Sequence, residues 1–206
     1  MRIGIDFDNT IVSYDALFYK VAHEQGVIPP NLAVTKLAVR NHLRGIDQED
    51  VWTEMQGYVY GARMDEAAMY PGALEFFSWA RTRKLDLAIV SHKTRHPFIG
   101  PQYDLHRAAR EWVDHHLVND GDRLIDPAQV YFELTKDAKI RRIHELACDC
   151  FIDDLPEIFL AERFPASTRR FLFDPDAHHP PISGIDTVHS WKDFQKTLEG
   201  RCSASH

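Results

Sequence analysis

Basic residues are in the minority in this chain of 206 residues. It holds 24 lysines and arginines against 31 aspartates and glutamates, so its formal net charge is −7. A protein that binds a nucleic-acid polymer carries a stripe of positive charge that neutralises phosphates. No such stripe stands out in the sequence, so we expect no nucleic-acid polymer as a partner. A small anion bound in a local pocket is compatible with this charge.

Long apolar runs are also missing. No stretch approaches the roughly 18 apolar residues that suggest a membrane-spanning helix. The first residues run straight into strand-like sequence and lack the charged-then-apolar pattern of a secretory leader. We therefore expect no membrane partner.

Cysteine is scarce, with only Cys148, Cys150 and Cys202. Three is an odd number and too few for a disulfide framework. Cys148 and Cys150 could supply half of a metal site, but the sequence has no second pair to complete it. We expect free, buried thiols, which fits a reducing cytoplasm.

The octet IGIDFDNT at residues 3–10 is the most informative feature that is present. An apolar strand ends on Asp6, and Asp8 follows two positions later. Two carboxylates this close repel each other unless a buried metal or a shared proton lies between them. The end of a first strand is where open α/β sheets bind ligands, so the octet suggests an enzyme with a carboxylate nucleophile. The alternative for an isolated D-x-D is an ordinary acidic turn.

Strands and helices alternate over most of the chain. The expected strands are 2–7, 85–90, 130–134, 148–152 and a last one at 170–173. The expected helices are 14–25, 35–43, one capped by Asp47 and running to 60, one opened by Pro71 and Gly72, 103–117, 136–147 and one starting at Pro156. The alternation predicts an α/β fold, a Rossmann-like parallel sheet covered by helices on both faces.

Residues 13–70 interrupt this alternation, because they read as helices with no convincing strand. We predict an α/β core domain made of residues 1–12 and 71–200, with a small helical cap of residues 13–70 inserted in it. Residues 201–206 are expected to form a flexible tail. In the core, the strand ends at Asp6, Ser91 and the pair Asp153–Asp154 would share one edge of the sheet.

These motifs resemble those of the haloacid dehalogenase (HAD) superfamily, most of whose members are magnesium-dependent phosphatases and phosphotransferases. DFDNT at 6–10 resembles the first motif, D-x-D-x-T/V, and Ser91 at the end of an apolar strand resembles the second. A lysine that opens the helix before the last acidic strand resembles the third motif, and Asp153–Asp154 in CFIDD the fourth. The core resemblance covers residues 1–12 and about 71–175.

The resemblance implies a role for each residue of the octet. Asp6 would attack phosphorus and become an aspartyl phosphate. Asp8 would protonate the leaving oxygen and then activate the hydrolytic water, while Thr10 holds Asp8 in place. Members that cleave carbon–halogen bonds lack the second acid, so Asp8 favours phosphate chemistry.

A metal site is expected at the same edge of the sheet. Four carboxylates in one crevice need a cation, and oxygen ligands with open water positions suit Mg²⁺. The resemblance implies that Mg²⁺ takes the Asp6 carboxylate, the Asp8 backbone carbonyl and one acid of the 153/154 pair. We expect Asp154 as the direct ligand, with Asp153 adjacent to it.

Positive and hydrogen-bonding groups must surround the transferred phosphoryl group. Ser91 offers a hydroxyl, and His92 and Lys93 follow it in a basic loop. Lys136 and Lys139 both lie near a helix start, and the spacing before FIDD in related sequences favours Lys139. We therefore expect Ser91, His92, Lys93 and Lys139 to bind the substrate phosphate.

Two other groups of residues are candidate sites. The aromatic and basic residues Trp52, Tyr58, Tyr60 and Arg63 could contact substrate from the cap, but packing inside the cap is the preferred interpretation for most of them. His178 and His179 are adjacent in sequence. They point poorly at a single ion, so a loop is favoured there over a metal site.

The expected partner is a small phosphorylated metabolite. The run from Ser91 to His116 is locally similar to 5′(3′)-deoxyribonucleotidases, which makes a nucleoside monophosphate the first substrate and a sugar phosphate the second. Two alternatives stay open: transfer of the phosphoryl group to an acceptor other than water, and a catalytically weak binding or regulatory protein on the same scaffold. The sequence leaves open the role of Arg95 and the oligomeric state.

Overall fold

A sheet of six parallel strands forms the centre of the core. The structure, a computed structural model, describes residues 1–202, and the side chains of 201 and 202 are outside that description. The strands run in the order β10-β9-β8-β1-β4-β7. They are β1 (Arg2–Ile5), β4 (Asp86–His92), β7 (Val130–Glu133), β8 (Cys150–Asp153), β9 (Arg169–Phe173) and β10 (Asp186–Val188).

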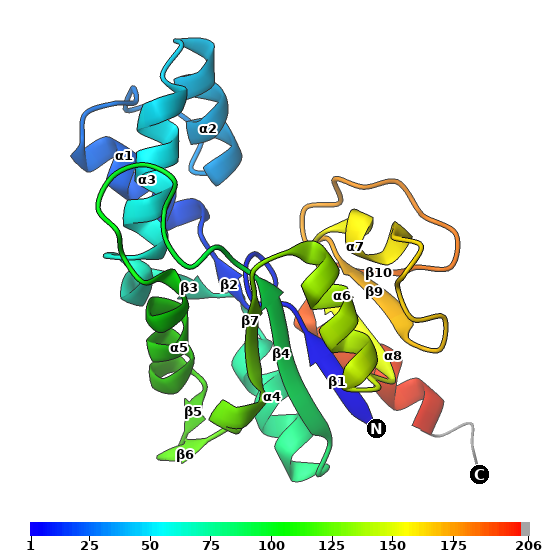
Figure 1. Cartoon of the computed structure of the whole chain (residues 1–206). Helices are drawn as coiled ribbons and strands as arrows, with labels where there is room; N and C mark the ends of the chain where they lie inside the picture. The colour runs from blue at the N-terminus through cyan, green and yellow to red at the C-terminus, as the bar shows by residue number, and fades with distance from the viewer. Residues whose placement is uncertain (203–206) are drawn as a thin grey trace. The chain divides into compact units, whose positions relative to one another are not determined.

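Helices cover both faces of this sheet, which confirms the expected Rossmann-like α/β fold. Figure 1 shows α6 (Lys136–Glu145) in front of the sheet and α4 (Ala73–Thr82) with α8 (Trp191–Cys202) behind it. The short helix α7 (Pro156–Leu160) follows β8. Parallel strands need such connections, because the chain has to cross back over the sheet before it starts the next strand in the same direction.

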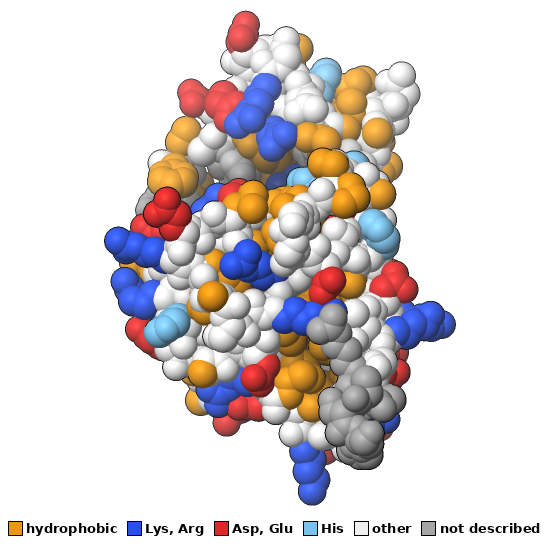
Figure 2. Space-filling view, turned by 90° about the vertical axis from the view of Figure 1, so that its right-hand side faces the viewer, with side chains coloured by type: hydrophobic (Ala, Val, Ile, Leu, Met, Phe, Trp, Pro, Cys, Tyr) orange, Lys and Arg blue, Asp and Glu red, His pale blue; other side chains and the backbone are white. Residues whose placement is uncertain are grey.

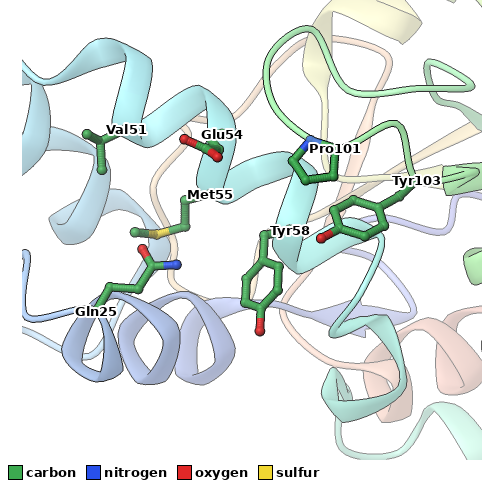
Figure 3. A pocket seen from close by; sticks show the side chains of 7 residues that line it. All are labelled: Gln25, Val51, Glu54, Met55, Tyr58, Pro101 and Tyr103. Atoms are coloured by element: carbon green, nitrogen blue, oxygen red, sulfur yellow. The ribbon is translucent and has the colours of Figure 1, made fainter.

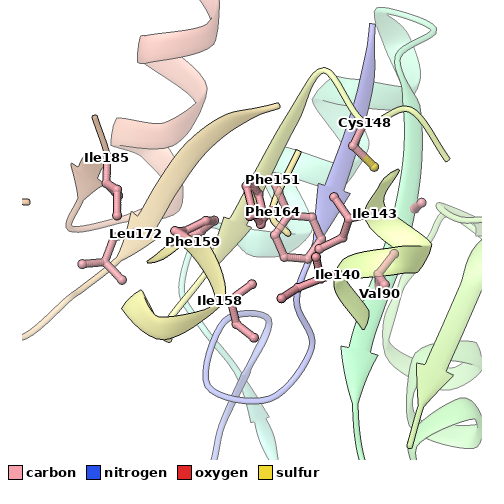
Figure 4. Packing of buried hydrophobic residues seen from close by; sticks show 11 residues of the cluster. Val90, Ile140, Ile143, Cys148, Phe151, Ile158, Phe159, Phe164, Leu172 and Ile185 are labelled. Carbon is pink, nitrogen blue, oxygen red and sulfur yellow. The ribbon is translucent and has the colours of Figure 1, made fainter. Parts of the chain in front are cut away.

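Two apolar layers hold the helices to the sheet. On the face of α6 and α7, Ile140, Ile143 and Ile158 pack with Phe151 of β8 (Figure 4). On the other face an aromatic cluster joins α4 to α8, with the rings of Phe76 and Phe194 and those of Phe76 and Trp191 each 5.0 Å apart. The strands between these layers are apolar almost throughout, as a sheet buried on both faces requires.

A second compact unit consists of Val12–Ala68 and Lys93–His116. It contains α1 (Asp15–Glu24), α2 (Lys36–Gly45), α3 (Glu49–Tyr60), η1 (Met64–Glu66) and α5 (Leu105–His116). We call it the helical unit, and the other, residues 1–11, 69–92 and the described residues from 117, the core unit. Segment 93–116 thus joins the expected cap segment 13–70, and Trp112 of α5 donates its indole N–H to the carbonyl of Ala67 at 2.9 Å.

Several short strands were not expected from the sequence. β2 (Val12–Ser13) pairs with β3 (Ala68–Met69), and of these residues all but Val12 lie in the range 13–70, which was expected to lack strands. β5 (Val118–Asn119) and β6 (Asp122–Arg123) form a hairpin where no strand was expected, just before η2 (Pro127–Gln129). Its turn, Asp120–Gly121, has positive φ at both residues, as a two-residue hairpin requires. Strands of two residues are too short to show a periodic pattern.

Three further expectations about elements are wrong. Asp47 does not cap α3, because Gln48 precedes the helix and Asp47 itself has a φ of 57°. The strand at 170–173 is not the last, since β10 follows it. Residues 201 and 202 continue α8 rather than starting a tail, and the expected tail at 203–206 lies outside the described residues.

The cysteine expectation is confirmed for two of the three residues. Cys148 and Cys150 are free and buried. Burial raises the pKa of Cys148 to about 11 and that of Cys150 to about 12, so both thiols stay protonated at neutral pH. The side chain of Cys202 lies outside the described part of the chain.

The surface agrees with the composition. On the face shown in Figure 2, lysine and arginine side chains are scattered among acidic ones rather than gathered in a stripe. Among residues 1–202, no helix is both long enough and apolar enough to cross a bilayer.

The substitution Gly4→Ala tests how tightly the core is packed on the face of the sheet that α6 covers. Gly4 of β1 pairs with Phe151 of β8, and a Cβ at Gly4 would collide with the Phe151 ring and lie 2.9 Å from the sulfur of Cys148. We expect Gly4→Ala to lower the free energy of unfolding by about 1–3 kcal/mol, because the core is overpacked. Chemical denaturation measures this change.

Gly200→Ala is the matched control. Gly200 lies in α8, and a Cβ there would meet no atom within 4 Å. Alanine favours a helix by up to about 1 kcal/mol over glycine, so this variant should be as stable as the wild type or more so. Equal denaturation midpoints for both variants would contradict the packing described at Gly4.

Candidate active site

The loop after β1 places Asp6 at the carboxyl edge of the sheet. The backbone N–H of Asp6 donates to the carbonyl of Ile152 at 2.9 Å, which extends the pairing of β1 with β8. The chain then turns sharply through Asn9, whose φ is 57°, a value that asparagine tolerates better than most residues. Asp6 is buried, and the buried hydroxyl of Thr10 donates to its Oδ2 at 3.5 Å. The loop therefore fixes the direction of the Asp6 carboxylate.

Lys139 meets this carboxylate from the first turn of α6. The hydroxyl of Thr135 accepts the N–H of Ala138 and caps the helix at this point. The Lys139 ammonium lies 2.5 Å from Oδ1 of Asp6 and 2.6 Å from Oδ2 of Asp153, and none of its side chain is exposed. Three residues far apart in sequence thus form one buried ion cluster at the ends of β1 and β8.

The acidic pair after β8 completes the cluster. Asp153 is fully buried, and its Oδ1 accepts the N–H of Leu155 at 3.0 Å. Asp154 is half-buried. One carboxylate oxygen from each of Asp6, Asp153 and Asp154 lies within 4.8 Å of the others. Hard cations are held by oxygen ligands at this kind of spacing.

Burial and ion pairing compete within the cluster. Burial alone would lower the pKa of Lys139, but Asp153 and Asp6 outweigh it, and the pKa of Lys139 is raised. At Asp153 burial dominates: it raises the pKa of this carboxyl to about 7, and Asp6 adds to the rise although Lys139 opposes it. Lys139 therefore remains charged, and one ammonium does not offset the buried acids.

The donor set fits a divalent cation. Asp6, Asp153 and Asp154 offer only oxygen atoms, and hard ions such as Mg²⁺ prefer oxygen. Burial first, and Asp6 in addition, raise the pKa of Asp153, and a bound cation would offset the charge of the gathered acids. Both acids of the pair belong to the donor set, so the structure does not single out Asp154 as the direct ligand.

Ser91 brings a hydroxyl to the same edge of the sheet. Ile89 of β4 is in register with Ile5 of β1, so Ser91 lies beside the turn that starts at Asp6. Ser91 is 1% exposed, and within the described residues its Oγ has no hydrogen-bond partner. A buried hydroxyl without a partner costs free energy unless a ligand or water satisfies it.

The other expected residues have different surroundings. Lys136 is outside the cluster: its ammonium pairs with Glu157 at 2.8 Å and is half-exposed. His92 ends β4 and is partly buried; burial first and then the charge of Lys139 lower its pKa. Asp8 is half-buried, two residues after Asp6. The contact seen for Thr10 joins it to Asp6.

Lys93 and Arg95 belong to the helical unit. The Lys93 ammonium lies 4.5 Å from the centre of the Tyr60 ring, and the side chain is buried. Arg95 pairs with Asp104 at 3.4 Å, within the loop before α5. Lys93 is therefore buried beside an aromatic ring, whereas Arg95 is exposed and paired with an acid.

The cap residues named from the sequence pack largely inside the helical unit. Trp52 is buried with its ring 4.9 Å from that of Phe18. Arg63 pairs with Glu24 at 2.7 Å and with Glu66. Trp52 therefore packs within the unit, as the preferred interpretation has it for most of these residues, whereas Arg63 forms ion pairs with two acidic residues of the unit.

The histidines at 178 and 179 belong to a loop that Asp174 organises. The backbone N–H groups of His178 and His179 each donate to the Asp174 carboxylate at 2.9 Å. The ring of His189 donates from Nδ1 to the Asp174 carbonyl at 2.6 Å. Asp174 is buried at the end of β9. Its position at a strand end was visible in the sequence, but its role as a loop anchor was not.

The raised pKa of Asp153 leads to a testable dependence of stability on pH. The folded pKa, about 7, lies above that of an unfolded aspartate, so the folded protein binds the extra proton between about pH 4 and 7. Without divalent cations, stability should fall as pH rises through this window. Asp153→Asn should flatten the slope, since the amide cannot ionise. Urea unfolding at several pH values in chelator measures both slopes.

An exposed acid provides the control for this experiment. Asp176 lies at the surface in the loop after β9, and Asp176→Asn should keep the wild-type slope. If the wild type and Asp153→Asn lose stability in parallel, burial of Asp153 is not the cause.

Comparison with known proteins identifies relatives by fold alone. No protein-family model and no curated protein matches the chain. A HAD-superfamily hydrolase from Ehrlichia chaffeensis is 12% identical, with a TM-score of 0.59 over 97% of this chain and 96% of that one. A HAD family hydrolase from Deinococcus radiodurans, solved with bound phosphate and sodium, is 14% identical, with a TM-score of 0.58 over 97% and 95%.

Dehalogenases are among the similar structures as well. The L-2-haloacid dehalogenase from Xanthobacter autotrophicus, with chloropropionic acid covalently bound, is 11% identical, with a TM-score of 0.52 over 97% of this chain and 98% of that one. Identities this low establish the architecture and not the reaction. The protein has the fold of the HAD-superfamily hydrolases.

Proposed function

We propose that the protein is a hydrolase of the HAD type, a Mg²⁺-dependent phosphatase of small phosphate monoesters. The observation that carries the proposal is the buried cluster in which Lys139 lies within 2.6 Å of both Asp6 and Asp153. The unpartnered hydroxyl of Ser91 lies at the same edge of the sheet. Phosphoryl transfer needs a nucleophile, a positive charge and a hydrogen-bond donor, and Asp6, the Lys139 ammonium and the Ser91 hydroxyl can supply them.

In the first step, the Asp6 carboxylate attacks phosphorus. The bond from phosphorus to the ester oxygen breaks, and Asp8 gives its proton to the departing alkoxide. Lys139 and Thr10 hold the two oxygens of Asp6, one each, so the nucleophile is oriented before the substrate arrives. The product of this step is an aspartyl phosphate and a free alcohol.

In the second step, the ionised Asp8 takes a proton from a water molecule, which attacks the phosphorus of the aspartyl phosphate. The acyl phosphate bond breaks, Asp6 returns to a carboxylate, and inorganic phosphate leaves. The Lys139 ammonium and the Ser91 hydroxyl offset negative charge on the phosphoryl oxygens in both steps.

Mg²⁺ would be held by Asp6 and the Asp153–Asp154 pair, with the Asp8 carbonyl as the resemblance implies. When bound, the ion supplies positive charge against the phosphoryl oxygens and against the gathered acids.

Asp8 is the residue that separates phosphate ester hydrolysis from dehalogenation. Dehalogenating members of the superfamily lack a second acid at this place, and this chain has one. The proposed substrate is a small phosphorylated metabolite, a nucleoside monophosphate first and a sugar phosphate second. Transfer to another acceptor shares the first step, and a weakly catalytic regulatory protein would lack turnover altogether.

Asp6→Asn tests the nucleophile. A panel of metabolite phosphates, assayed for released phosphate with Mg²⁺ and with EDTA, should show hydrolysis by the wild type that needs the metal. Asp6→Asn should lower the turnover by about 1,000-fold or more, because an amide cannot form the aspartyl phosphate. Its thermal unfolding should stay cooperative.

The outcomes of this assay are distinct. Full activity of Asp6→Asn with Mg²⁺ present would rule out the mechanism. Release of halide from 2-chloropropionate, with no release of phosphate from any ester, would favour dehalogenation. Absence of both activities would favour a binding or regulatory role.

Two lysines one helical turn apart give a matched comparison of the phosphate clamp. Lys139 lies in the buried cluster, whereas Lys136 is half-exposed beside Glu157. Lys139→Met should cost about 100-fold or more in kcat/KM and should also lower the melting temperature, since it leaves two buried acids without their cation.

Lys136→Met should keep kcat/KM within about two-fold, because exposed ion pairs contribute little. Steady-state kinetics and a thermal melt measure both variants. Equal losses from the two substitutions would place the essential cation outside the buried cluster.

A further inference from the structure

A residue near the end of the chain contacts the loop that carries Asp6 and Asp8. We call residues 6–11 the 6–11 loop. Trp191, at the start of α8, donates its indole N–H to the carbonyl of Thr10 at 3.1 Å, and both residues are fully buried. They are 181 positions apart in sequence, and both belong to the core unit. The 6–11 loop therefore depends on a part of the chain that lies outside all four motifs.

We propose that Trp191 is a positioning residue for the reaction: its indole N–H fixes the 6–11 loop and thereby the direction of the Asp6 carboxylate. The connection is short, because the hydroxyl of Thr10 donates to Oδ2 of Asp6 at 3.5 Å. Thr10 is thus held at its carbonyl and itself holds the nucleophile. This inference rests on the proposed phosphatase function and adds to it a residue that no motif contains.

Backbone hydrogen bonds hold the 6–11 loop at its two ends. At its start, the N–H of Asp6 donates to the carbonyl of Ile152. At its end, the N–H of Tyr70 donates to the carbonyl of Ile11 at 2.8 Å, directly after the carbonyl that Trp191 holds. Of these three donors, only the indole belongs to a side chain, so a substitution can remove it without changing the backbone.

The buried carbonyl of Thr10 needs a donor. Because Thr10 is fully buried, bulk water does not replace the indole N–H, and a buried carbonyl without a partner costs free energy. The loop has to shift if it is to recover a hydrogen bond. A misplacement of about 1 Å in a reacting group can cost about 100-fold in rate. Loss of this donor should therefore affect the chemical step more than substrate binding.

The ring of Trp191 is itself held on several sides. Its centre lies 5.0 Å from that of the Phe76 ring and 6.0 Å from that of the Phe173 ring. A Cβ at Gly72, whose φ is 86°, would lie only 3.2 Å from Cβ of Trp191, so the glycine leaves room for the tryptophan. Closely packed rings have little freedom to turn, and the indole N–H points at Thr10 before any substrate binds.

The turn before α8 ties Trp191 to the edge of the sheet where the acids lie. Nδ1 of His189 contacts the carbonyl of Asp174 at 2.6 Å, and the hydroxyl of Ser190 accepts the N–H of Asp193 at 3.1 Å, as a helix cap does. Asp174 directly follows β9, so it lies at the carboxyl edge of the parallel sheet. The support of the 6–11 loop thus begins at the strand ends themselves.

Trp191→Phe tests the inference because it removes the N–H and keeps an aromatic ring. With the ester that the wild type hydrolyses best, kcat should fall about ten-fold or more and KM should stay within about two-fold, since the substrate contacts remain. Benzothienylalanine at position 191, in which sulfur replaces the indole N–H, keeps the size of the ring and should lower kcat to the same extent. Steady-state kinetics measures both variants.

Two control variants change the same aromatic cluster and leave this hydrogen bond intact. Trp79→Phe removes an indole N–H that has no hydrogen-bond partner within the described residues, from a ring 5.5 Å from that of Phe76. Phe194→Leu should lower the melting temperature, because it leaves a cavity beside Phe76. Both should keep kcat within about two-fold at a temperature where all variants are folded. If kcat instead falls with the melting temperature in every variant, Trp191 is a packing residue only.

Hydrogen exchange measures the position of the loop without any substrate. The amides of Asp6 and Ile11 are hydrogen-bonded within the core unit. In Trp191→Phe, peptides that contain residues 6–11 should exchange about ten-fold faster than in the wild type, because the loop opens more often. In Trp79→Phe they should exchange at the wild-type rate.

Helix α3 is an internal reference for the exchange experiment. Val51, Met55 and Tyr58 of this helix line a cavity of about 250 Å³ in the helical unit (Figure 3). A segment beside a cavity has few packing contacts and responds early to a general loss of stability. Exchange in α3 should therefore be the same in Trp191→Phe and in the wild type.

The two measurements separate this inference from the proposed function. If no ester is hydrolysed but Trp191→Phe speeds exchange in the 6–11 loop and Trp79→Phe does not, the phosphatase function is wrong and Trp191 still positions the loop. If esters are hydrolysed and Trp191→Phe keeps kcat within about two-fold of the wild type, or leaves exchange in the loop unchanged, the positioning role is overturned.

Discussion

A lysine buried between two carboxylates is the interaction on which this site depends. Lys139 has no exposed side-chain surface, and its ammonium lies within 2.6 Å of Asp6 and Asp153. Transferring a lone charge into a protein interior is expensive, so each member of the cluster is stable there only because of the others. The acids outnumber the cation, which leaves a pocket that attracts further positive charge.

The parallel sheet is what brings these groups together. β1 and β8 are neighbours, so Asp6 and Asp153 leave adjacent strands at the same edge. α6 connects β7 to β8 across the face of the sheet and carries Lys139 to that edge. Open α/β folds place their ligand sites at the carboxyl ends of strands for this geometric reason.

The helical unit depends on the close packing of two separate chain segments. Its segments come from two stretches of the chain, and Gly57 of α3 and Gly61 directly after it let the loop that holds Pro97 and Tyr103 approach closely. The basic loop after Ser91 therefore belongs with the inserted helices, although it follows directly from a core strand. A single residue, His92, separates Ser91 of the core unit from Lys93 of the helical unit.

The alternation of apolar strands and helices was enough to predict the parallel sheet, since a strand buried on both faces reads as a continuous apolar run. The short strands β2, β3, β5 and β6 left no such signal. The prediction that Asp47 caps a helix was also wrong. Aspartate is common both at helix caps and in left-handed turns, and here it adopts the left-handed turn.

By itself, the sequence determined which residues stand at the strand ends: Asp6, Ser91 and the pair Asp153–Asp154. Spacing in related sequences favoured Lys139 over Lys136 but did not give the contacts of its side chain. Those come from the tertiary structure, which brings the Lys139 ammonium against Asp6 and Asp153 at the ends of β1 and β8. The hydrogen bond from Trp191 to Thr10 was likewise hidden, because contacts between distant segments arise from packing rather than from sequence spacing.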